Sequence, residues 1–389
     1  MTTKSNALTF VILIGIVSLC ADATYEGGRS IAGAYLGFLG ASGAVVGIVA
    51  GAGELVGFGL RLLTGYLSDK TKQYWSLKTL GYIINTGAIP LLALTGRWET
   101  AAALLVAERA GRAVRSPPRD VLLSHAASRV GSGFGFGLHE ALDQIGAVSG
   151  PLVVAGILAW RSQAYNTSFA VLVVPAVVGL LILLWMQRRY PNPREFEMTP
   201  QTLSSQGIPR LFWIYLAGVA LLALGYADFP LIAFHFQQTE VMAVSDIPIF
   251  YAVAMAADAI AALILGRLFD RSGSITLVAA FLLSSLSVPL AFLGSKSLAL
   301  LGMALWGIGM GTQESIMKAM VATLVPIERR GSAFGLFYVG YGIAWFVGST
   351  AMGLLYDRAI AGLLAFSIVA QITAVVVLFG VSRQQTQST

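Results

Sequence analysis

The sequence predicts an all-α membrane protein with 12 transmembrane helices, arranged as two six-helix bundles related by pseudo-symmetry. Two observations lead to this prediction: the composition of the chain, and a repeat of short motifs along it. Of the 389 residues, 56% are hydrophobic and only 11% are charged, and the mean hydropathy is +0.76. Soluble proteins average about 25% charged residues. Such a chain has too few polar side chains to cover itself in water, so we do not expect a soluble enzyme.

The repeat consists of motifs that recur about two hundred residues further along the chain. Gly65-Tyr-Leu-Ser-Asp69-Lys70 recurs as Gly266-Arg-Leu-Phe-Asp270-Arg271, and the run that begins at Arg129 recurs at Arg329. Both copies run in the same order, which predicts one unit duplicated in parallel. In membrane proteins built from such repeats, binding sites lie where the repeats meet.

Twelve segments are candidates for crossing a bilayer, which takes about 20 mostly apolar residues. The second, fourth, eighth and tenth carry charges and are assigned because the repeat requires a partner for each of them. The predicted spans are 7–30, 40–67, 75–96, 99–126, 133–159, 165–187, 210–236, 246–269, 274–293, 297–325, 331–356 and 360–381.

The longest polar stretch is rich in Arg, Pro, Ser and Gln and predicts a cytoplasmic linker at 188–209, between an N-terminal bundle at 1–187 and a C-terminal bundle at 210–389. Basic residues gather at one side of the predicted spans and explain the net charge of +6 without any nucleic-acid partner. By the positive-inside rule, both termini are expected on the cytoplasmic side. The membrane is expected to be a plasma (bacterial inner) membrane. The few basic residues expected on the other side are Arg97, Arg161, Lys296 and Arg358.

The loop motifs resemble those of the major facilitator superfamily, whose signature between helices 2 and 3 reads Gly-x-Leu-x-Asp-Arg/Lys. Gly65, Leu67, Asp69 and Lys70 match it, although the second glycine of the signature is missing, and Gly266, Asp270 and Arg271 match it again. Gly146-x-x-x-Gly150-Pro151 is similar to the helix-5 motif of antiporters and drug exporters in that family. The segment from Arg115 to Asp120 is similar to its bacterial efflux branch. The resemblance implies a transporter in which the two loop motifs act as gates.

Ionisable residues inside the predicted spans are candidates for the site, because a charge at mid-membrane costs roughly 2.5–3.5 kcal/mol. In the first span, Asp22, Glu26 and Arg29 share one helix face, and Asp228 is the counterpart of Glu26 in the second bundle. These carboxylates could bind and release protons. Alternatively, Glu26 and Arg29 form a static ion pair, which would leave Asp22 as the better proton carrier.

The fourth and fifth spans carry the next group of charges. Glu108, Arg112, Arg115 and Arg119 form one stripe, with Arg112 the best candidate to contact the substrate or a carboxylate. In the fifth span, His139 and Asp143 have the composition of a proton relay. Asp143 could equally pair with an arginine of the fourth span and hold the two helices together.

The second bundle contributes Glu314 and Lys318, which are spaced as an i, i+4 pair. Asp258, Glu54 and Arg61 fit either a cavity or helix–helix contacts. Aromatic side chains of the first, seventh and eleventh spans fit packing or the binding of an amphipathic solute, with cation–π contact open to a cationic one. They are Tyr25, Tyr226, Phe229, Phe337, Tyr338, Tyr341 and Trp345.

Three functions can be compared against these residues. The first is secondary active transport of a small organic solute by alternating access, as proton-coupled efflux (antiport). The second is uptake or facilitated transport of an anionic metabolite bound by Arg112 and Lys318. The third, a sensor or membrane enzyme, is disfavoured because the sequence has no nucleotide-binding loop, metal cluster or nucleophile elbow. We expect no metal and no cofactor, a proton gradient as the energy source, and a monomer.

Overall fold

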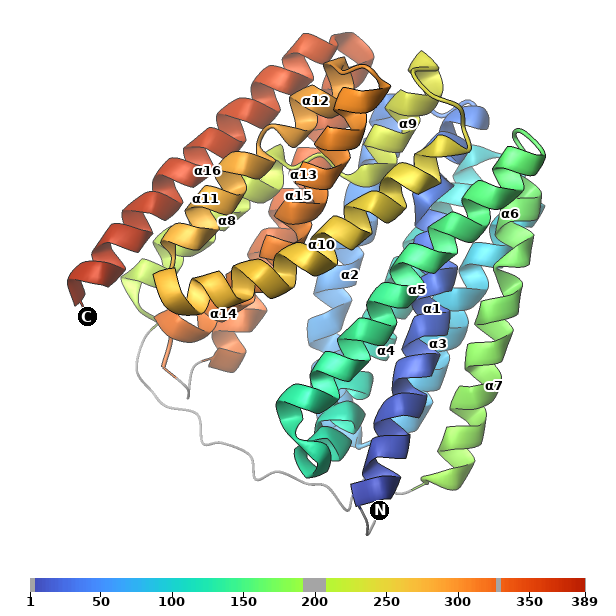
Figure 1. Cartoon of the computed structure of the whole chain (residues 1–389), viewed down its shortest axis with the longest axis vertical. Helices are drawn as coiled ribbons and strands as arrows, with labels where there is room; N and C mark the ends of the chain where they lie inside the picture. Colours follow the sequence, from blue (N-terminus) through green and yellow to red (C-terminus); the bar gives the residue numbers. More distant parts are fainter. Residues whose placement is uncertain (1–3, 192–207, 327–329, 389) are drawn as a thin grey trace. The chain divides into compact units, whose positions relative to one another are not determined.

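The computed structural model describes residues 4–191, 208–326 and 330–388, and these ranges contain helices and no strand. The predicted all-α membrane fold is confirmed (Figure 1). One short 3-10 helix, Leu92–Leu94, follows α3. The helices are α1 (Lys4–Phe38), α2 (Gly43–Thr71), α3 (Tyr74–Leu91), α4 (Trp98–Val130), α5 (Ser132–Trp160), α6 (Tyr165–Val171), α7 (Val173–Arg189), α8 (Arg210–Gly225), α9 (Phe229–Thr239), α10 (Asp246–Ser272), α11 (Ile275–Ser284), α12 (Ser287–Leu293), α13 (Lys296–Glu314), α14 (Ile316–Leu324), α15 (Arg330–Arg358) and α16 (Ile360–Ser388).

Each predicted span corresponds to one helix or to two consecutive ones. Four spans are interrupted, at Leu172, at 226–228, at 285–286 and at Ser315. Ten helical spans of the described residues are long and apolar enough to cross a membrane, and neither α4 nor α13 with α14 is among them. The predicted number of twelve spans therefore depends on these two charged segments.

Contacts divide the chain into two compact units. Unit 1 comprises the described parts of Met1–Gly40, Val56–Thr199 and Val244–Ala252, and unit 2 comprises those of Ala41–Leu55, Pro200–Ala243 and Val253–Thr389. The start of α10 thus packs in unit 1 and the first half of α2 in unit 2, although the sequence assigned each to the other bundle. The greater part of the predicted linker, 188–209, lies outside the described residues, and the predicted bundle boundaries stay a prediction.

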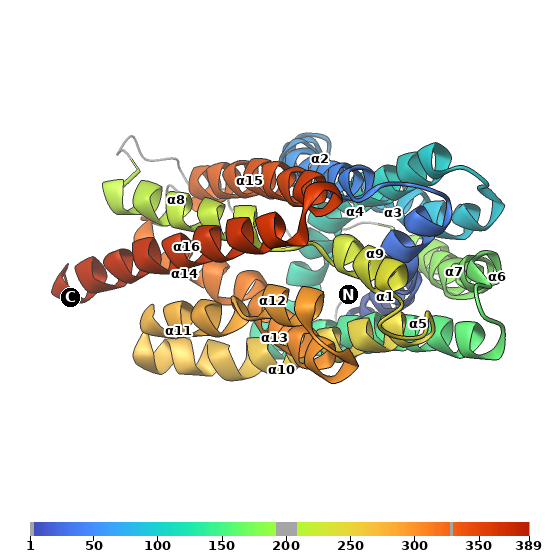
Figure 2. The ribbon, with the colours of Figure 1, turned by 90° about the horizontal axis from the view of Figure 1, so that it is seen from above.

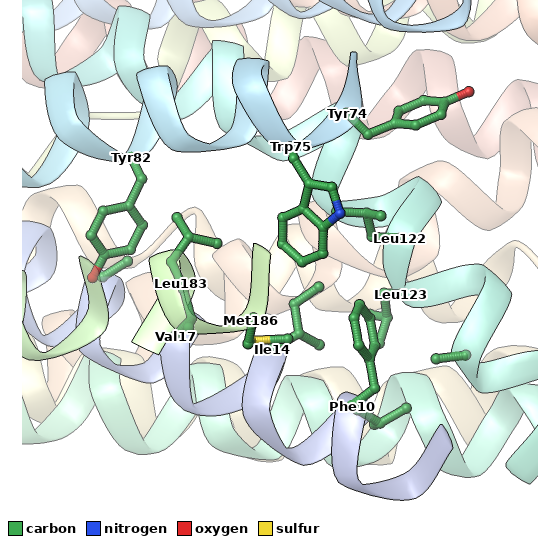
Figure 3. Close-up of a cluster of buried hydrophobic side chains, with 13 residues drawn as sticks. Phe10, Ile14, Val17, Tyr74, Trp75, Tyr82, Leu122, Leu123, Leu183 and Met186 are labelled. Atoms are coloured by element: carbon green, nitrogen blue, oxygen red, sulfur yellow. The ribbon is translucent and has the colours of Figure 1, made fainter. Parts of the chain in front are cut away.

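In unit 1, α1 packs against α5, α4 and α7 (Figure 1). Apolar side chains at one end of these helices and of α3 form a buried cluster, shown in Figure 3, that includes Phe10, Trp75 and Met186. The indole Nε1 of Trp75 donates a hydrogen bond to the carbonyl oxygen of Tyr190 at 2.9 Å. A buried N–H without an acceptor is costly, so this bond lets the indole lie in an apolar environment.

Glycine allows α3 and α4 to pack backbone against backbone. A Cβ atom at Gly81 would lie 2.9 Å from Cα of Arg115, and one at Gly111 would lie 2.8 Å from Cα of Asn85. Close approach through small residues is the usual way in which membrane helices associate. As a result, polar residues of α3 lie directly beside the charged face of α4.

In unit 2, α8 packs against both α15 and α16 (Figure 2). The helix stops at Gly225 and resumes as α9 at Phe229. Side chains satisfy the carbonyl groups that this interruption exposes: Ser367 and Gln371 donate to the carbonyl of Gly225 at 2.6 and 3.0 Å, and Trp306 Nε1 donates to that of Ala227 at 2.8 Å. Irregular backbone at membrane depth requires such partners.

Candidate functional site

The charged face of α4 organises the candidate site in unit 1. The helix continues from Trp98 to Val130 through Pro117 and Pro118, so the prolines do not end it. The sequence favours a kink or an end of the helix at these prolines, with Arg119 displaced, but the helix and its stripe of charged residues continue past them. Along this stripe, each residue described below has a partner on α1, α3 or α5.

Arg115 is the arginine that pairs with a carboxylate of α1. Its Nη2 atom lies 3.2 Å from Oδ1 of Asp22, and only 2% and 6% of the two residues are exposed. Arg112, the residue favoured from the sequence for such a contact, places its guanidinium 4.5 Å from the centre of the Tyr25 ring. Of the two arginines, Arg115 therefore compensates the charge of Asp22 directly, and Arg112 makes a cation–π contact beside it.

Glu26 accepts a hydrogen bond from a residue that the sequence analysis did not identify. The hydroxyl of Tyr251, in the part of α10 that belongs to unit 1, donates to Oε2 of Glu26 at 2.5 Å. Both residues are buried. No sequence pattern marks Tyr251, because it lies in an apolar span far from Glu26 along the chain.

Glu108 begins the stripe and is held by α3. The amide Nδ2 of Asn85 donates to Oε1 of Glu108 at 2.7 Å, and Nε of Arg109 lies 3.5 Å from the other carboxylate oxygen. Asn85 is fully buried and was also missed from the sequence. These bonds make Glu108 a fixed part of the α3–α4 contact.

Asp143 on α5 connects α4 to a histidine. Its Oδ2 atom lies 3.4 Å from Nη1 of Arg119 and 3.5 Å from Nδ1 of His139. Nε2 of His139 lies 3.0 Å from the hydroxyl of Ser18 on α1. Both alternatives from the sequence are present in this geometry: Asp143 holds α5 to α4, and an imidazole lies beside a carboxylate.

The glycines of the helix-5 motif lie directly against α1 at Asp22. A Cβ atom at Gly146 would lie 3.1 Å from Cβ of Asp22, and one at Gly150 would collide with the carbonyl of Ala23. The motif therefore brings the backbones of α5 and α1 together beside the Asp22–Arg115 ion pair. Its role visible in the structure is helix packing.

In unit 2, Asp228 is the last residue of the interruption between α8 and α9 and occupies the N-cap position of α9. It is 1% exposed, and its Oδ2 atom accepts a hydrogen bond from Nε1 of Trp345 at 3.2 Å. The predicted span across this point treated it as continuous helix. The sequence did contain a signal, because Asp followed by Pro230 is typical of a helix start.

Aromatic side chains surround Asp228. The ring of Tyr226 lies 5.7 Å from that of Trp306 and 5.7 Å from that of Trp345, which in turn lies 5.3 Å from that of Tyr341. Tyr341 donates a hydrogen bond to Gln313, and Tyr226 to the carbonyl of Trp306. Three of the predicted aromatics, Tyr226, Tyr341 and Trp345, are thus accounted for by packing and hydrogen bonds, and Tyr25 in unit 1 by its contact with Arg112.

The remaining predicted residues of unit 2 are Glu314, Lys318 and Tyr338. Glu314 is exposed and ends α13, whereas Lys318 is half-buried and lies on α14 beyond the interruption at Ser315, so the regular i, i+4 spacing is broken between them. Tyr338 is half-buried and stacks on Phe334, with ring centres 6.3 Å apart. The charge of Glu314 still acts on Tyr341, as that of Asp228 does.

The gating motifs lie at the ends of α2 and α10. Lys70 and Arg271 are exposed, and a Cβ atom at Gly65 or Gly266 would meet nothing within 4 Å. The side chains of Asp69 and Asp270 lie outside the part of the structure that is described. The predicted gating role of both motifs therefore stays a prediction.

The two units combine long apolar helices with buried, paired charges, and this combination defines a polytopic membrane protein. The family model described as "Major Facilitator Superfamily" matches residues 6–349, with a second match over 229–388. The chain belongs to the major facilitator superfamily. Among the described residues, no group of three His, Cys, Asp or Glu side chains is placed to hold a metal ion.

Relatives and solved structures agree with this assignment. The chain is 43% identical over 382 residues to an uncharacterized protein of Mycobacterium tuberculosis, covering 97% of this chain and 93% of the relative. It is 27% identical over 358 residues to an uncharacterized MFS-type transporter of Methanocaldococcus jannaschii, covering 89% and 88%.

Two solved structures share the fold at low sequence identity. A variant of the nucleoside transporter NupG superposes with a TM-score of 0.77 at 14% identity, covering 96% of this chain and 99% of that one. A bacterial homolog of the human lysosomal transporter Spinster, inward-facing and occupied, gives 0.76 at 14% identity and covers 98% of each chain. At these identities the likeness establishes the fold alone.

Proposed function

We propose that this chain is a proton-coupled secondary transporter that exports a small organic solute by alternating access. The observation that supports this proposal is the set of buried carboxylates within the predicted spans of both units. Asp22, Glu26 and Asp143 lie in unit 1 and Asp228 lies in unit 2. Ionisable groups at membrane depth are costly and mark ion or substrate pathways.

The coupling would run through the Asp22–Arg115 pair. When Asp22 is ionised, it compensates the guanidinium of Arg115 across the α1–α4 contact. When it is protonated, Arg115 loses that compensation, and a buried charge without a partner is strongly unfavourable. Proton binding would therefore weaken one arrangement of α1 and α4 relative to another, which is what coupling of protonation to alternating access requires.

A second candidate is the uptake of an anionic metabolite bound by Arg112 and Lys318. One observation favours it: both residues are only half-buried, so their cationic groups are more accessible than the guanidinium of Arg115. The fold does not choose between the two, because it is shared by proteins named for nucleosides and by a homologue of an iron transporter.

The test is transport in inverted membrane vesicles with an imposed pH gradient. Growth screening of a host that expresses the chain, against a panel of drugs and metabolites, would supply the solute. We expect accumulation that depends on the gradient in the wild type and is lost in Asp22→Asn and in Glu26→Gln. Glu99→Gln, an exposed acid at the start of the same α4, is the matched control.

Two outcomes would reject the proposal in different ways. Transport that ignores the gradient would remove proton coupling. Loss of transport in Arg112→Ala, with Asp22→Asn and Glu26→Gln fully active, would support the anion carrier instead. The monomeric state, the bacterial inner membrane and the cytoplasmic termini belong to the same proposal, and labelling of terminal cysteines in oriented vesicles would test the topology.

A further inference from the structure

Lys78 on α3 is a buried cation that the proposed function leaves without a role. Only 1% of the residue is exposed, and none of the described residues accepts a hydrogen bond from its Nζ atom. The Nζ atom lies 6.0 Å from the centre of the Trp75 ring. A charged amine inside a membrane span needs a partner or a function.

The charges around Lys78 show that it is the basic group of its cluster without a paired carboxylate among the described residues. Those that act on it are Arg119 and Arg115, followed by Asp120 and Asp143. Arg115 is paired with Asp22, and Arg119 is paired with Asp120 at 2.9 Å and with Asp143 at 3.4 Å. Each acid of the cluster therefore already has an arginine, and Lys78 has none of them.

The matching acceptor is the second oxygen of Asp143. Both contacts of this carboxylate, to Arg119 and to His139, use Oδ2 and are long. Its Oδ1 atom is buried and accepts no hydrogen bond from any described residue. A buried donor and a buried acceptor, each unsatisfied, lie in one charged cluster. Burial without a hydrogen-bond partner is unfavourable for each group, and more so for a charged one, so a state that pairs the two groups is favoured.

We infer that Lys78 is a further positioning residue for transport, which takes the carboxylate of Asp143 over from Arg119 during the transport cycle. Arg119 can release Asp143 because it keeps Asp120, and His139 keeps its contact with Ser18. The lysine side chain is long and rotamer-rich, so its amine can change partners by rotation of the side chain. The inference rests on the proposed alternating-access function but not on its coupling to protons.

The experiment uses a conformational readout that needs neither a solute nor a pH gradient. Gly51 of α2 and Ser349 of α15 would be replaced by cysteine, since a Cβ atom at Gly51 would lie 3.1 Å from Cβ of Ser349. The rate of oxidative cross-linking in membranes then reports how often this contact is closed. Lys78→Met, Asp143→Asn and the double variant would be compared in that background, with Lys296→Met, an exposed lysine of α13, as control.

We expect Lys78→Met and Asp143→Asn each to change the cross-linking rate about fivefold, and the double variant to match either single one, because paired residues are not additive. Lys78→Arg should restore the wild-type rate, since it keeps the charge. Effects that multiply in the double variant, or a wild-type rate in Lys78→Met, would overturn the inference. If Lys78→Met does not fold, the same cycle is built from Lys78→Gln and Asp143→Asn. In that cycle, too, additive effects of the two substitutions would overturn the inference. A transporter that is not coupled to protons would still show the same non-additive cross-linking rates.

Discussion

Arg115 of α4 and Asp22 of α1 form an ion pair inside unit 1, with 3.2 Å between Nη2 and Oδ1. The pair lies beside the closest approach of α1 to α5, where Gly146 and Gly150 replace side chains with backbone contact. One charged contact and one glycine contact therefore hold the same stretch of α1 from two sides. Substitutions at Arg115 and at Gly150 separate the contributions of these two contacts to the stability of the protein.

Removal of one member of the ion pair should destabilise the protein. Arg115→Gln leaves Asp22 buried without compensation, and such changes cost about 3–5 kcal/mol. The double variant Asp22→Asn/Arg115→Gln should lose less than Arg115→Gln alone. Unfolding of the purified protein in detergent would measure both. Arg97→Gln, an exposed arginine, is the control and should unfold like the wild type; equal stability of Arg115→Gln and this control would contradict the prediction.

The close packing of α5 on α1 predicts a strong effect at Gly150. In Gly150→Leu, the added side chain collides with the backbone of Ala23, and overpacking costs typically 1–3 kcal/mol, occasionally more. Lower thermal stability and less folded protein in membranes are expected. Gly156→Leu on the same helix is the matched control, because a Cβ atom there meets nothing within 4 Å. If both variants behave alike, the packing argument fails.

The hydrogen bond from Tyr251 to Glu26 predicts that removal of the Tyr251 hydroxyl alone lowers transport. Tyr251→Phe removes a bond to an acidic group that is worth roughly 1.5–3 kcal/mol if Glu26 is charged. We expect the rate of gradient-driven transport to fall about tenfold, as 1.4 kcal/mol corresponds to a factor of ten. Tyr190→Phe is a control for loss of a hydroxyl. A transport rate of Tyr251→Phe equal to that of the wild type would disprove the role.

Alternating access predicts that α2 and α15 must separate during transport. The disulfide between Gly51→Cys and Ser349→Cys should therefore stop solute movement, and reduction should restore it. The single cysteine variants, treated with the same oxidant, control for reaction of Cys20, which is the one natural cysteine and is buried. Full transport with the cross-link intact would rule out movement at this contact.

Much of the fold could be predicted because helix boundaries follow composition and charge. The predicted span 99–126 agrees with α4 despite its many charges, since the repeat required a helix there. The interruptions could not be predicted from hydropathy, because apolar residues lie on both sides of each. At Asp228, the available signal was local: an Asp followed by Pro230 is typical of a helix start. The span 210–236 was instead predicted as one continuous helix.

The sequence predicted which residues belong to the candidate site better than it predicted which of them contact one another. The α4 stripe follows from helical spacing, but the choice of Arg115 over Arg112 as the partner of Asp22 depends on how α1 and α4 pack. Asn85, Tyr251 and Lys78 were missed for the same reason. Each lies in an apolar or short polar context. Only the folded chain brings Asn85 and Tyr251 into contact with a carboxylate and Lys78 into the charged cluster.

The interrupted helix at 226–228 has a consequence for how unit 2 can move. The carbonyls of Gly225 and Ala227 are anchored by donors from α16 and α13. Straightening this elbow would strand an indole, an amide and a hydroxyl in a dry interior at the same time. The interruption at 226–228 is therefore rigid, and a displacement of α9 must be accompanied by a displacement of α13 and α16.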